Sequence, residues 1–363
     1  EILFRTRLSE DMFRGLAPWV QRLPGRLMHV NVIGCGIFAA VSGSSAATCA
    51  TIGKMSLPAL QARGYHKPMA IGSLAGSGTL GLLIPPSIIM IVYGVAAEVS
   101  IVRLFIAGVI PGLMLIGLFS GYIALWSLLN PSRTPRRDPR TTWRQKLDAS
   151  ASLLPIILLI LAVIGSIYGG VATASEAAVM GVTGALVLSA WGGTLTRESF
   201  VASLMGAVRL ACMINFILAG AAFLTQAMAY SRIPVAMAQW VGAQGFHPYM
   251  VIGALTALYV VLGCFIDGVS MIVLTVSVAL PIIQAAGFDL LWFGIFIVLV
   301  VEMAQITPPV GFNLFVLQGL TGENIFRIAA ATAPFFLLMC TAVALVTVFP
   351  ELATWLPSTM FSN

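Results

Sequence analysis

The sequence predicts an all-α membrane protein that crosses the bilayer many times and contains two inverted structural repeats. Three observations predict this fold class: an apolar composition, a repeat along the chain, and interruptions at matching positions of the repeats. Hydrophobic residues make up 59% of the 363 residues and charged residues only 9%, whereas a soluble domain carries roughly 25% charged residues. Such a chain cannot cover its surface with polar groups, which excludes soluble enzymes, nucleic-acid-binding proteins and disordered tails.

The first element, residues 1–27, is expected to be an amphipathic arm lying in the membrane interface. Apolar side chains such as Phe4 and Trp19 are interleaved with arginines such as Arg5 and Arg14, and this mixture suits a helix at the lipid headgroups. The sequence begins without an initiator Met or a signal-peptide pattern. We therefore interpret it as a piece of a longer polypeptide.

Apolar segments that meet the requirement of about 20 residues for a spanning helix follow one another along the rest of the chain. Spans are predicted at 29–60, 68–97, 102–129, 150–171, 174–192, 203–229, 249–285, 291–318 and 327–349. They group into a first repeat transport core at 28–101, a span at 102–129, a basic linker at 130–149, scaffold spans and an arm at 150–247, a second repeat transport core at 248–320 and a C-terminal span at 321–363.

The linker sets the orientation of the chain. Residues 130–146 hold six Lys and Arg residues, and short loops rich in these residues stay in the cytoplasm. A localisation in the bacterial inner membrane, with this linker on the cytoplasmic side, follows from this pattern.

The repeat appears when the sequence is compared with itself at an offset of 223 residues. Pro58 then falls on Pro281, Gly64 on Gly287, and the pair Pro85-Pro86 on Pro308-Pro309, with no gap between them. The loop at 61–67 contains Arg63 and Lys67, whereas the matching loop at 284–289 contains no Lys or Arg. By the same charge rule the two loops lie on opposite sides, so the repeats are inverted, as in many secondary transporters.

Each repeat contains two interruptions. Residues 42–45 and 265–268 suit the tips of re-entrant helical hairpins, and the two Pro-Pro pairs must kink or unwind their helices because proline lacks a backbone donor. Carbonyls freed in this way need a partner at membrane depth, and a cation such as Na⁺ is one that gives the defect a use. Asp267 and Glu302 are intramembrane carboxylates, each read either as functional or as making a buried structural hydrogen bond.

A carboxylate substrate would find donors and positive helix ends near these breaks. Ser44, Ser45, Thr48, Asn31 and Asn313 can donate hydrogen bonds, and helix N-termini near residues 46 and 269 favour negative charge. These residues, with Asp267, are the candidate substrate site.

Several motifs are similar to those of one transporter family, the large membrane (M) subunit of tripartite ATP-independent periplasmic (TRAP) transporters. The resemblance covers essentially the whole chain and depends on 30–32, 42–48, 81–87, 93–94, 175–178, 302–313, 349–351 and 355–357. It implies an elevator-type importer of organic anions, often carboxylates such as C4-dicarboxylates or sialic acids. It also implies a small four-helix membrane subunit, fused or separate, and a periplasmic substrate-binding protein as partners.

The same resemblance implies two Na⁺ sites as the only bound cofactors, with no nucleotide. One would involve Ser42, Ser45, Gly81, Ile84 and Pro85, and the other Gly263, Ala304, Thr307 and Val310. The sequence departs from the family pattern at Ala304, where Gly is usual, and at 173–176, but neither change removes a carbonyl.

Other functions remain as alternatives. A proton-coupled organic-anion transporter would use Asp267 and Glu302 as carriers, and an ion channel is disfavoured by two closed hairpin tips. An ATP-driven pump lacks a phosphate loop, since Gly53-Lys54 is not followed by Ser or Thr. An intramembrane serine protease lacks a deep base, because the three histidines lie near predicted span ends, and a purely structural anchor leaves the symmetric breaks unexplained. We therefore expect a transporter and not an enzyme.

Overall fold

The computed structural model describes residues 1–3, 8–135 and 142–360, and over these residues it is entirely helical. Five helices are long and apolar enough to cross a membrane, and two bent helix pairs meet the same criterion if each pair is one span. The predicted all-α membrane fold is confirmed. Predictions about residues 4–7, 136–141 and 361–363 lie outside the described residues, and the side chains of 8–10 are also left undescribed.

The first repeat is a helical hairpin followed by a broken helix and a long helix. Gly43 and Ser44 separate the two hairpin arms, and residues 84–87 interrupt the broken helix, which bends by 41°. The helices are α2 (Met28–Ser42), α3 (Ser45–Ala62), α4 (Lys67–Leu83), α5 (Ile88–Ala96) and α6 (Ile101–Leu129).

The second repeat has the same order of elements. Its helices are α12 (Pro248–Gly263), α13 (Gly268–Ala285), α14 (Leu290–Gln305), α15 (Phe312–Thr321) and α16 (Ile325–Val348). At the offset of 223 residues, α3 and α13 coincide at both ends, and α4 and α14 begin at the same position. The repeat in the sequence is therefore a repeat in the helices.

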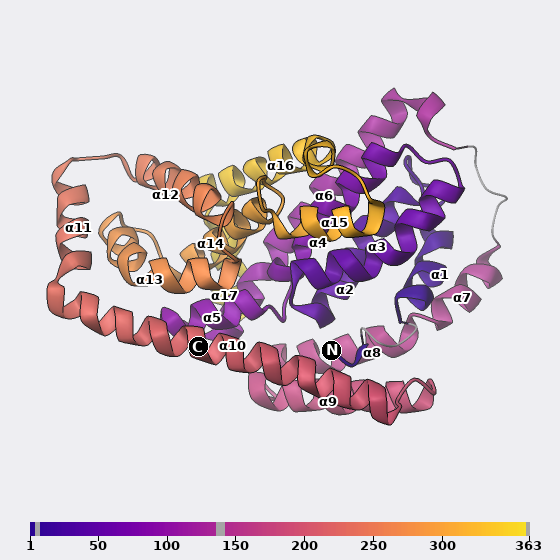
Figure 1. The fold of residues 1–363 in the computed structure, drawn as a ribbon, viewed down its shortest axis with the longest axis horizontal. Coiled ribbons are helices and arrows are strands. Elements are labelled where there is room, and N and C mark those ends of the chain that lie inside the picture. Colours follow the sequence, from indigo (N-terminus) through magenta and orange to yellow (C-terminus); the bar gives the residue numbers. More distant parts are fainter. Residues whose placement is uncertain (4–7, 136–141, 361–363) are drawn as a thin grey trace.

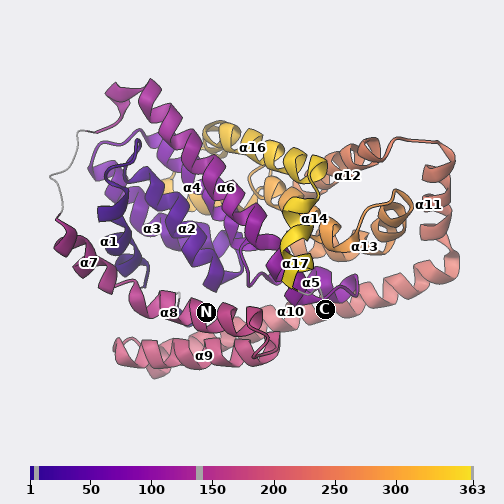
Figure 2. The ribbon, with the colours of Figure 1, turned by 180° about the vertical axis from the view of Figure 1, so that it is seen from behind.

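The two repeats are interlocked rather than placed side by side (Figures 1 and 2). The second half of the first broken helix, α5, packs against the second hairpin at α13, and its counterpart α15 packs against the first hairpin at α3. Reciprocal packing of this kind is what a two-fold relation between the repeats produces. Each hairpin consequently borders elements of both repeats.

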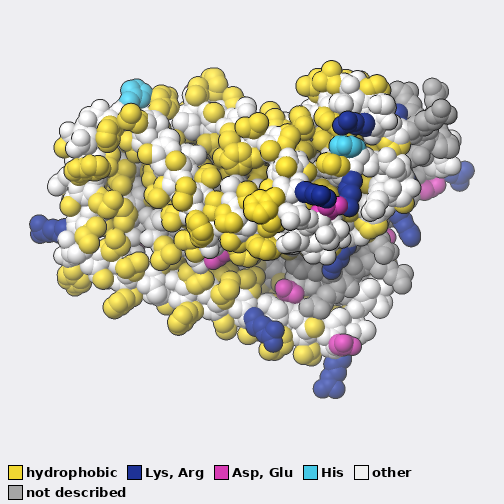
Figure 3. Space-filling model, turned by 45° about the horizontal axis from the view of Figure 1, so that its top comes forward, with side chains coloured by type: hydrophobic (Ala, Val, Ile, Leu, Met, Phe, Trp, Pro, Cys, Tyr) yellow, Lys and Arg dark blue, Asp and Glu magenta, His cyan; other side chains and the backbone are white. Residues whose placement is uncertain are grey.

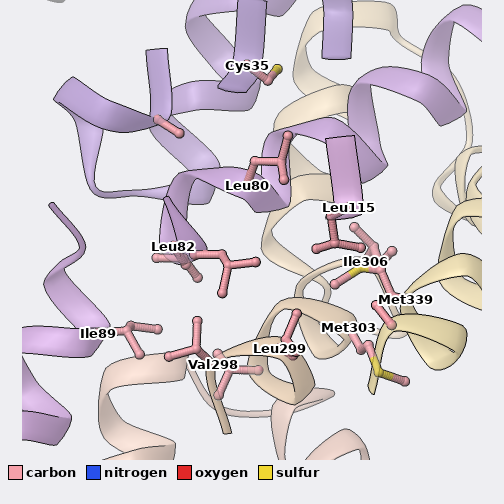
Figure 4. Packing of buried hydrophobic residues seen from close by; sticks show 14 of the residues in the cluster. Cys35, Leu80, Leu82, Ile89, Leu115, Val298, Leu299, Met303, Ile306 and Met339 are labelled. Carbon is pink, nitrogen blue, oxygen red and sulfur yellow. The ribbon is translucent and has the colours of Figure 1, made fainter. Parts of the chain in front are cut away.

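The centre of the molecule is the contact between α4 and α14. Every residue of α14 from Trp292 to Gln305 is buried, as is every residue of α4 from Met69 to Leu83. Figure 4 shows Leu80 and Leu82 of α4 facing Val298, Leu299 and Met303 of α14. An 11-to-16-residue stretch without a polar face fits only the interior of a helix bundle.

The other helices surround this centre. Among them, α10 has only one buried residue, Ser203, and a face of the molecule in Figure 3 is largely apolar, with most charged side chains gathered toward one end. These helices are α1 (Leu8–Val20), α7 (Trp143–Ala151), α8 (Leu154–Tyr168), α9 (Ala174–Trp191), α10 (Arg197–Ser231), α11 (Ile233–Ala243) and α17 (Glu351–Met360), with a short 3-10 helix, η2 (Pro131–Arg133).

Three details differ from the sequence predictions. The basic linker is partly helical, because Thr142 caps α7 through its side chain and a reciprocal bond with Gln145. The span predicted at 150–171 is bent by 60° between α7 and α8, so its straight part begins at Leu154. The C-terminal segment contains a second helix, α17, because Pro350 ends one helix and can start the next, where its missing N–H is not needed.

Candidate functional site

The first hairpin tip is a two-residue reversal held by its own serines. Gly43 has a left-handed backbone with φ of 60°, which glycine adopts without strain. Ser44 is the N-cap of α3 and its hydroxyl accepts a hydrogen bond from the Ala47 N–H. The Ser42 hydroxyl lies 2.5 Å from the Thr48 hydroxyl across the tip. The tip is therefore polar and compact at the point where the chain turns.

The first helix break follows from the two prolines. Pro85 and Pro86 have no N–H, so the carbonyls of Gly81 and Leu82 lose their helical donors. The Ser87 hydroxyl donates to the Leu82 carbonyl and replaces one of these bonds. The Gly81 carbonyl receives no such replacement from a described residue.

The hairpin tip and the break are in direct contact. A Cβ on Gly81 would lie only 2.4 Å from the Ser44 carbonyl oxygen, so a residue without a side chain is required there. The Ile88 N–H donates to the Gly43 carbonyl at 3.4 Å. Because Ser42, Ser45, Ile84 and Pro85 flank these contacts in the chain, the structure brings the five predicted residues of the first ion site to one place.

The second hairpin tip repeats this design with an acid. Asp267, at the position equivalent to Ser44, is the N-cap of α13, and its carboxylate accepts bonds from the Val269 and Ser270 N–H groups at 3.0 and 3.1 Å. The preceding Cys264 thiol lies 3.3 Å from the Pro308 carbonyl oxygen. This tip is therefore also joined to its broken helix.

The second break places Gly263, Ala304 and Thr307 together. A Cβ on Gly263 would lie 2.1 Å from the Cβ of Ala304, so the two backbones meet across a single methyl group. The Thr307 N–H donates to the Ala304 carbonyl at 3.1 Å, and the Thr307 hydroxyl donates to the Met303 carbonyl at 2.7 Å. Val310 is half-buried on the far side of the prolines, next to Gly311, which has a φ of 42°.

Each break therefore offers two kinds of charge to a ligand. The ends of α4 and α14 present carbonyl oxygens, which carry partial negative charge and suit a hard cation. The starts of α3 and α13 present N–H groups, which suit an anion. Among the described residues no group of three or more His, Cys, Asp and Glu side chains is placed to hold a metal ion.

The candidate substrate residues divide into two groups. Ser44, Ser45 and Thr48 lie at the first tip, and Asn313 of α15 approaches the same region, since its amide nitrogen lies 3.3 Å from where a Cβ on Gly78 would be. Asn31 does not join them. It lies about 17 Å along α2 from Ser42, and its amide donates to the Ala70 carbonyl and the Ser73 hydroxyl of α4.

Glu302 is a second carboxylate of the region, and it was not among the residues assigned to a predicted site. It is completely buried in α14, one turn before the second break, and lies beside the backbone of Leu82 and Leu83 at the first break. Neither of its oxygens meets the geometric limits of a hydrogen bond with a described group. The sequence signal for it was an acid within an apolar run, without any indication of what it would face.

Two hairpins whose tips meet two broken helices inside an apolar bundle define a secondary transporter built from inverted repeats. The family model for the tripartite ATP-independent periplasmic transporter, DctM component, matches residues 1–352. The chain belongs to this family, as the large membrane subunit of such a transporter. It is a transport permease of the bacterial inner membrane and not an enzyme.

Individual relatives agree with this assignment. The chain is 34% identical over 349 residues to the C4-dicarboxylate TRAP transporter large permease protein DctM of Rhodobacter capsulatus, covering 92% of this chain and 79% of the relative. It is 30% identical to the isethionate TRAP transporter permease protein DctMQ of Oleidesulfovibrio alaskensis, covering 91% of this chain and 52% of the relative. The crystal structure of the YdaH transporter of Alcanivorax borkumensis shares the fold, with a TM-score of 0.58, 16% identity, and coverage of 96% of this chain and 84% of that one.

Proposed function

We propose that this subunit imports an organic anion together with Na⁺. The observation that carries the proposal is the contact of each hairpin tip with a helix end that has lost donors to prolines, at Gly81 and at Ala304. Carbonyls that lack a donor at membrane depth are costly unless a ligand compensates them. Na⁺ at these two points would order the tips, and the ordered tips would complete the substrate pocket.

The substrate we propose is a C4-dicarboxylate, because the Rhodobacter relative carries that name. Isethionate, named for the Oleidesulfovibrio relative, and sialic acid have the same requirement for hydrogen-bond donors and positive helix ends. The hydroxyls at the first tip and the start of α3 would receive the carboxylate. The two hairpins and broken helices would then move together across the membrane as an elevator.

We further propose that the subunit works with a small four-helix membrane subunit and a periplasmic substrate-binding protein. The family is tripartite by description, and the name DctMQ of one relative indicates that the two membrane parts can form one chain. The binding protein would deliver the anion to the tips from the periplasmic side.

The test is uptake of radiolabelled succinate into proteoliposomes that contain both membrane subunits, with the binding protein outside. A Na⁺ gradient should drive accumulation with a Hill slope above one, because two sites are expected. Replacement of Na⁺ by choline should abolish it. Uptake that persists in choline and collapses with a protonophore would instead indicate proton coupling, and downhill flux without any coupling ion would indicate a channel.

A further inference from the structure

A cavity of about 250 Å³ lies at the loop end of the first hairpin, away from both helix breaks. It is bounded by the last turns of α3, the start of α4 and the end of α15. Its polar lining includes Lys54, Gln61, Tyr65, Lys67 and Thr321. A cavity of this size is close to the lower end of the range for small-molecule sites.

The cavity is cationic, and its two lysines differ. Lys67 donates to Glu323 at 2.6 Å, and this hydrogen bond keeps the pKa of the Glu323 carboxyl below its usual value. Lys54 is exposed on α3 and makes no hydrogen bond or ion pair with another described residue. The Lys54 ammonium is therefore the free positive charge of this cavity.

The positive charge is not a requirement of the fold, as the other repeat shows. At the offset of 223 residues, Lys54 corresponds to Ser277 and Lys67 to Leu290. The helices that carry these residues begin at equivalent positions in the two repeats. Equivalent backbones thus carry two cations in the first repeat and none in the second, so the difference is specific to one end of the molecule.

The cavity is connected to the candidate substrate site by a seam between two helices. Helices α3 and α15 pack side by side (Figure 1), and each carries a residue of both places: Thr48 and Lys54 on α3, and Asn313 and Thr321 on α15. The separations along the helices are about 9 Å and about 12 Å. The loop at 61–67 is the one whose basic residues predict a cytoplasmic position, so this seam leads toward the cytoplasm.

We propose that this cavity is a second anion site, at the cytoplasmic exit of the transport path, where Lys54 receives the carboxylate of the departing substrate. The proposal depends on the proposed function for the direction of transport. A lysine that attracts the anion on one side only favours its release there, because the equivalent Ser277 on the other hairpin offers no charge. Binding is expected to be weak, since the ammonium is exposed to solvent.

The experiment measures protection of a single cysteine in the cavity. Leu57→Cys, on a background with the five native cysteines replaced, is labelled with a maleimide in phosphatidylcholine nanodiscs that contain the complete membrane complex. Succinate should slow labelling, whereas sodium chloride of equal ionic strength should not. Adding Lys54→Gln should raise the succinate concentration needed for half-maximal protection about fivefold, as for loss of an exposed charge pair, and adding Arg63→Gln, in the same loop but outside the cavity, should not.

Equal protection with and without Lys54→Gln would overturn the proposal, as would protection by phosphatidylglycerol alone with no further effect of succinate, which would make the cavity a lipid headgroup site. Failure of the proposed function is distinguishable from these outcomes. In that case succinate is not accumulated under any ion gradient, although Lys54-dependent protection by succinate can still be measured.

Discussion

In the first repeat the hairpin tip is built from serines, whereas in the second repeat it is built around an aspartate. Ser44 and Asp267 occupy the same position and perform the same task, because each caps the second arm of its hairpin. One turn before the breaks, Thr79 of the first repeat corresponds to Glu302 of the second. Both repeats thus share the backbone of the site, while the acidic groups near the breaks belong to the second repeat only.

This difference separates what the fold requires from what transport requires. Caps, prolines and small residues recur in both repeats because each hairpin must turn and each helix must break. Carboxylates occur at one tip and not at the other, so they are not needed for turning the chain. The neutral first tip is the better place for an anionic substrate, since a carboxylate beside Asp267 would be repelled unless a cation lay between them.

The largest expected effect concerns the orientation of the repeats. Gln61 and Gln284 are exposed and equivalent in the two repeats, so we compare Gln61→Cys with Gln284→Cys on a cysteine-free background. A membrane-impermeant maleimide added to spheroplasts should label position 284 and leave position 61 unlabelled until the cells are opened. Labelling of both from outside would show that the loops share a side and that the repeats are not inverted.

The next largest effect concerns the close contacts between tip and break. Gly81→Ala and Gly263→Ala should each cost about 1–3 kcal/mol through overpacking, with loss of folded yield, because the added methyl would lie 2.4 or 2.1 Å from a neighbouring atom. Fluorescence-detected size exclusion with heating measures this loss. Gly117→Ala in α6, which has no neighbour within 4 Å, is the control, and Ala304→Gly should rescue Gly263→Ala but not Gly81→Ala.

Glu302→Gln tests the acid that only the second repeat has. The buried carboxylate makes no hydrogen bond, so its removal should stabilise the Na⁺-free protein by about 1–3 kcal/mol and reduce the thermal shift produced by Na⁺. Melting curves in detergent at several Na⁺ concentrations provide both values. Thr79→Val in the first repeat should instead destabilise slightly, because the hydroxyl donates to the Gly76 carbonyl. A lower melting temperature for Glu302→Gln would mean that the carboxylate has a partner.

Removal of the two caps should have similar, smaller effects. Ser44→Ala and Asp267→Ala are each expected to cost about 1 kcal/mol, and Asp267→Asn should retain the cap because its amide oxygen can still accept the two N–H bonds. Denaturant unfolding in detergent gives the stabilities. If Asp267→Asn unfolds as readily as Asp267→Ala, the charge rather than the cap holds the second tip.

The smallest effect is expected for Thr307→Val. The variant keeps the shape of the side chain but removes one oxygen from the second break, so the Na⁺ concentration for half-maximal uptake should rise about two- to fivefold while the saturated rate changes little. Thr341→Val is the matched control, since its hydroxyl makes the same type of bond to a carbonyl one turn earlier. An unchanged Na⁺ dependence would remove Thr307 from the proposed ion site and leave the prolines as a hinge.

The positions of the breaks could be predicted from the sequence because their causes are local. Proline removes a donor wherever it stands, and Gly43 and Asp267 suit a turn and a cap by their own chemistry. The sequence did not predict the bend between α7 and α8 or the helix α17, since neither interrupts the apolar pattern. Which residues meet across the site, such as Gly263 with Ala304 or Glu302 with the first break, depends on packing between segments far apart in the chain. Only the family resemblance anticipated part of this.

The length of α10 links the surrounding lipid to the second hairpin. Its 35 residues extend about 52 Å, whereas the hydrocarbon layer is about 30 Å thick. The helix must therefore incline by about 55° or project from the layer. Its length is fixed and the thickness of a bilayer is not, so lipids of different acyl-chain length will set different inclinations. Because α10 continues into α11, which packs on α13, a change of inclination reaches the arm that Asp267 caps.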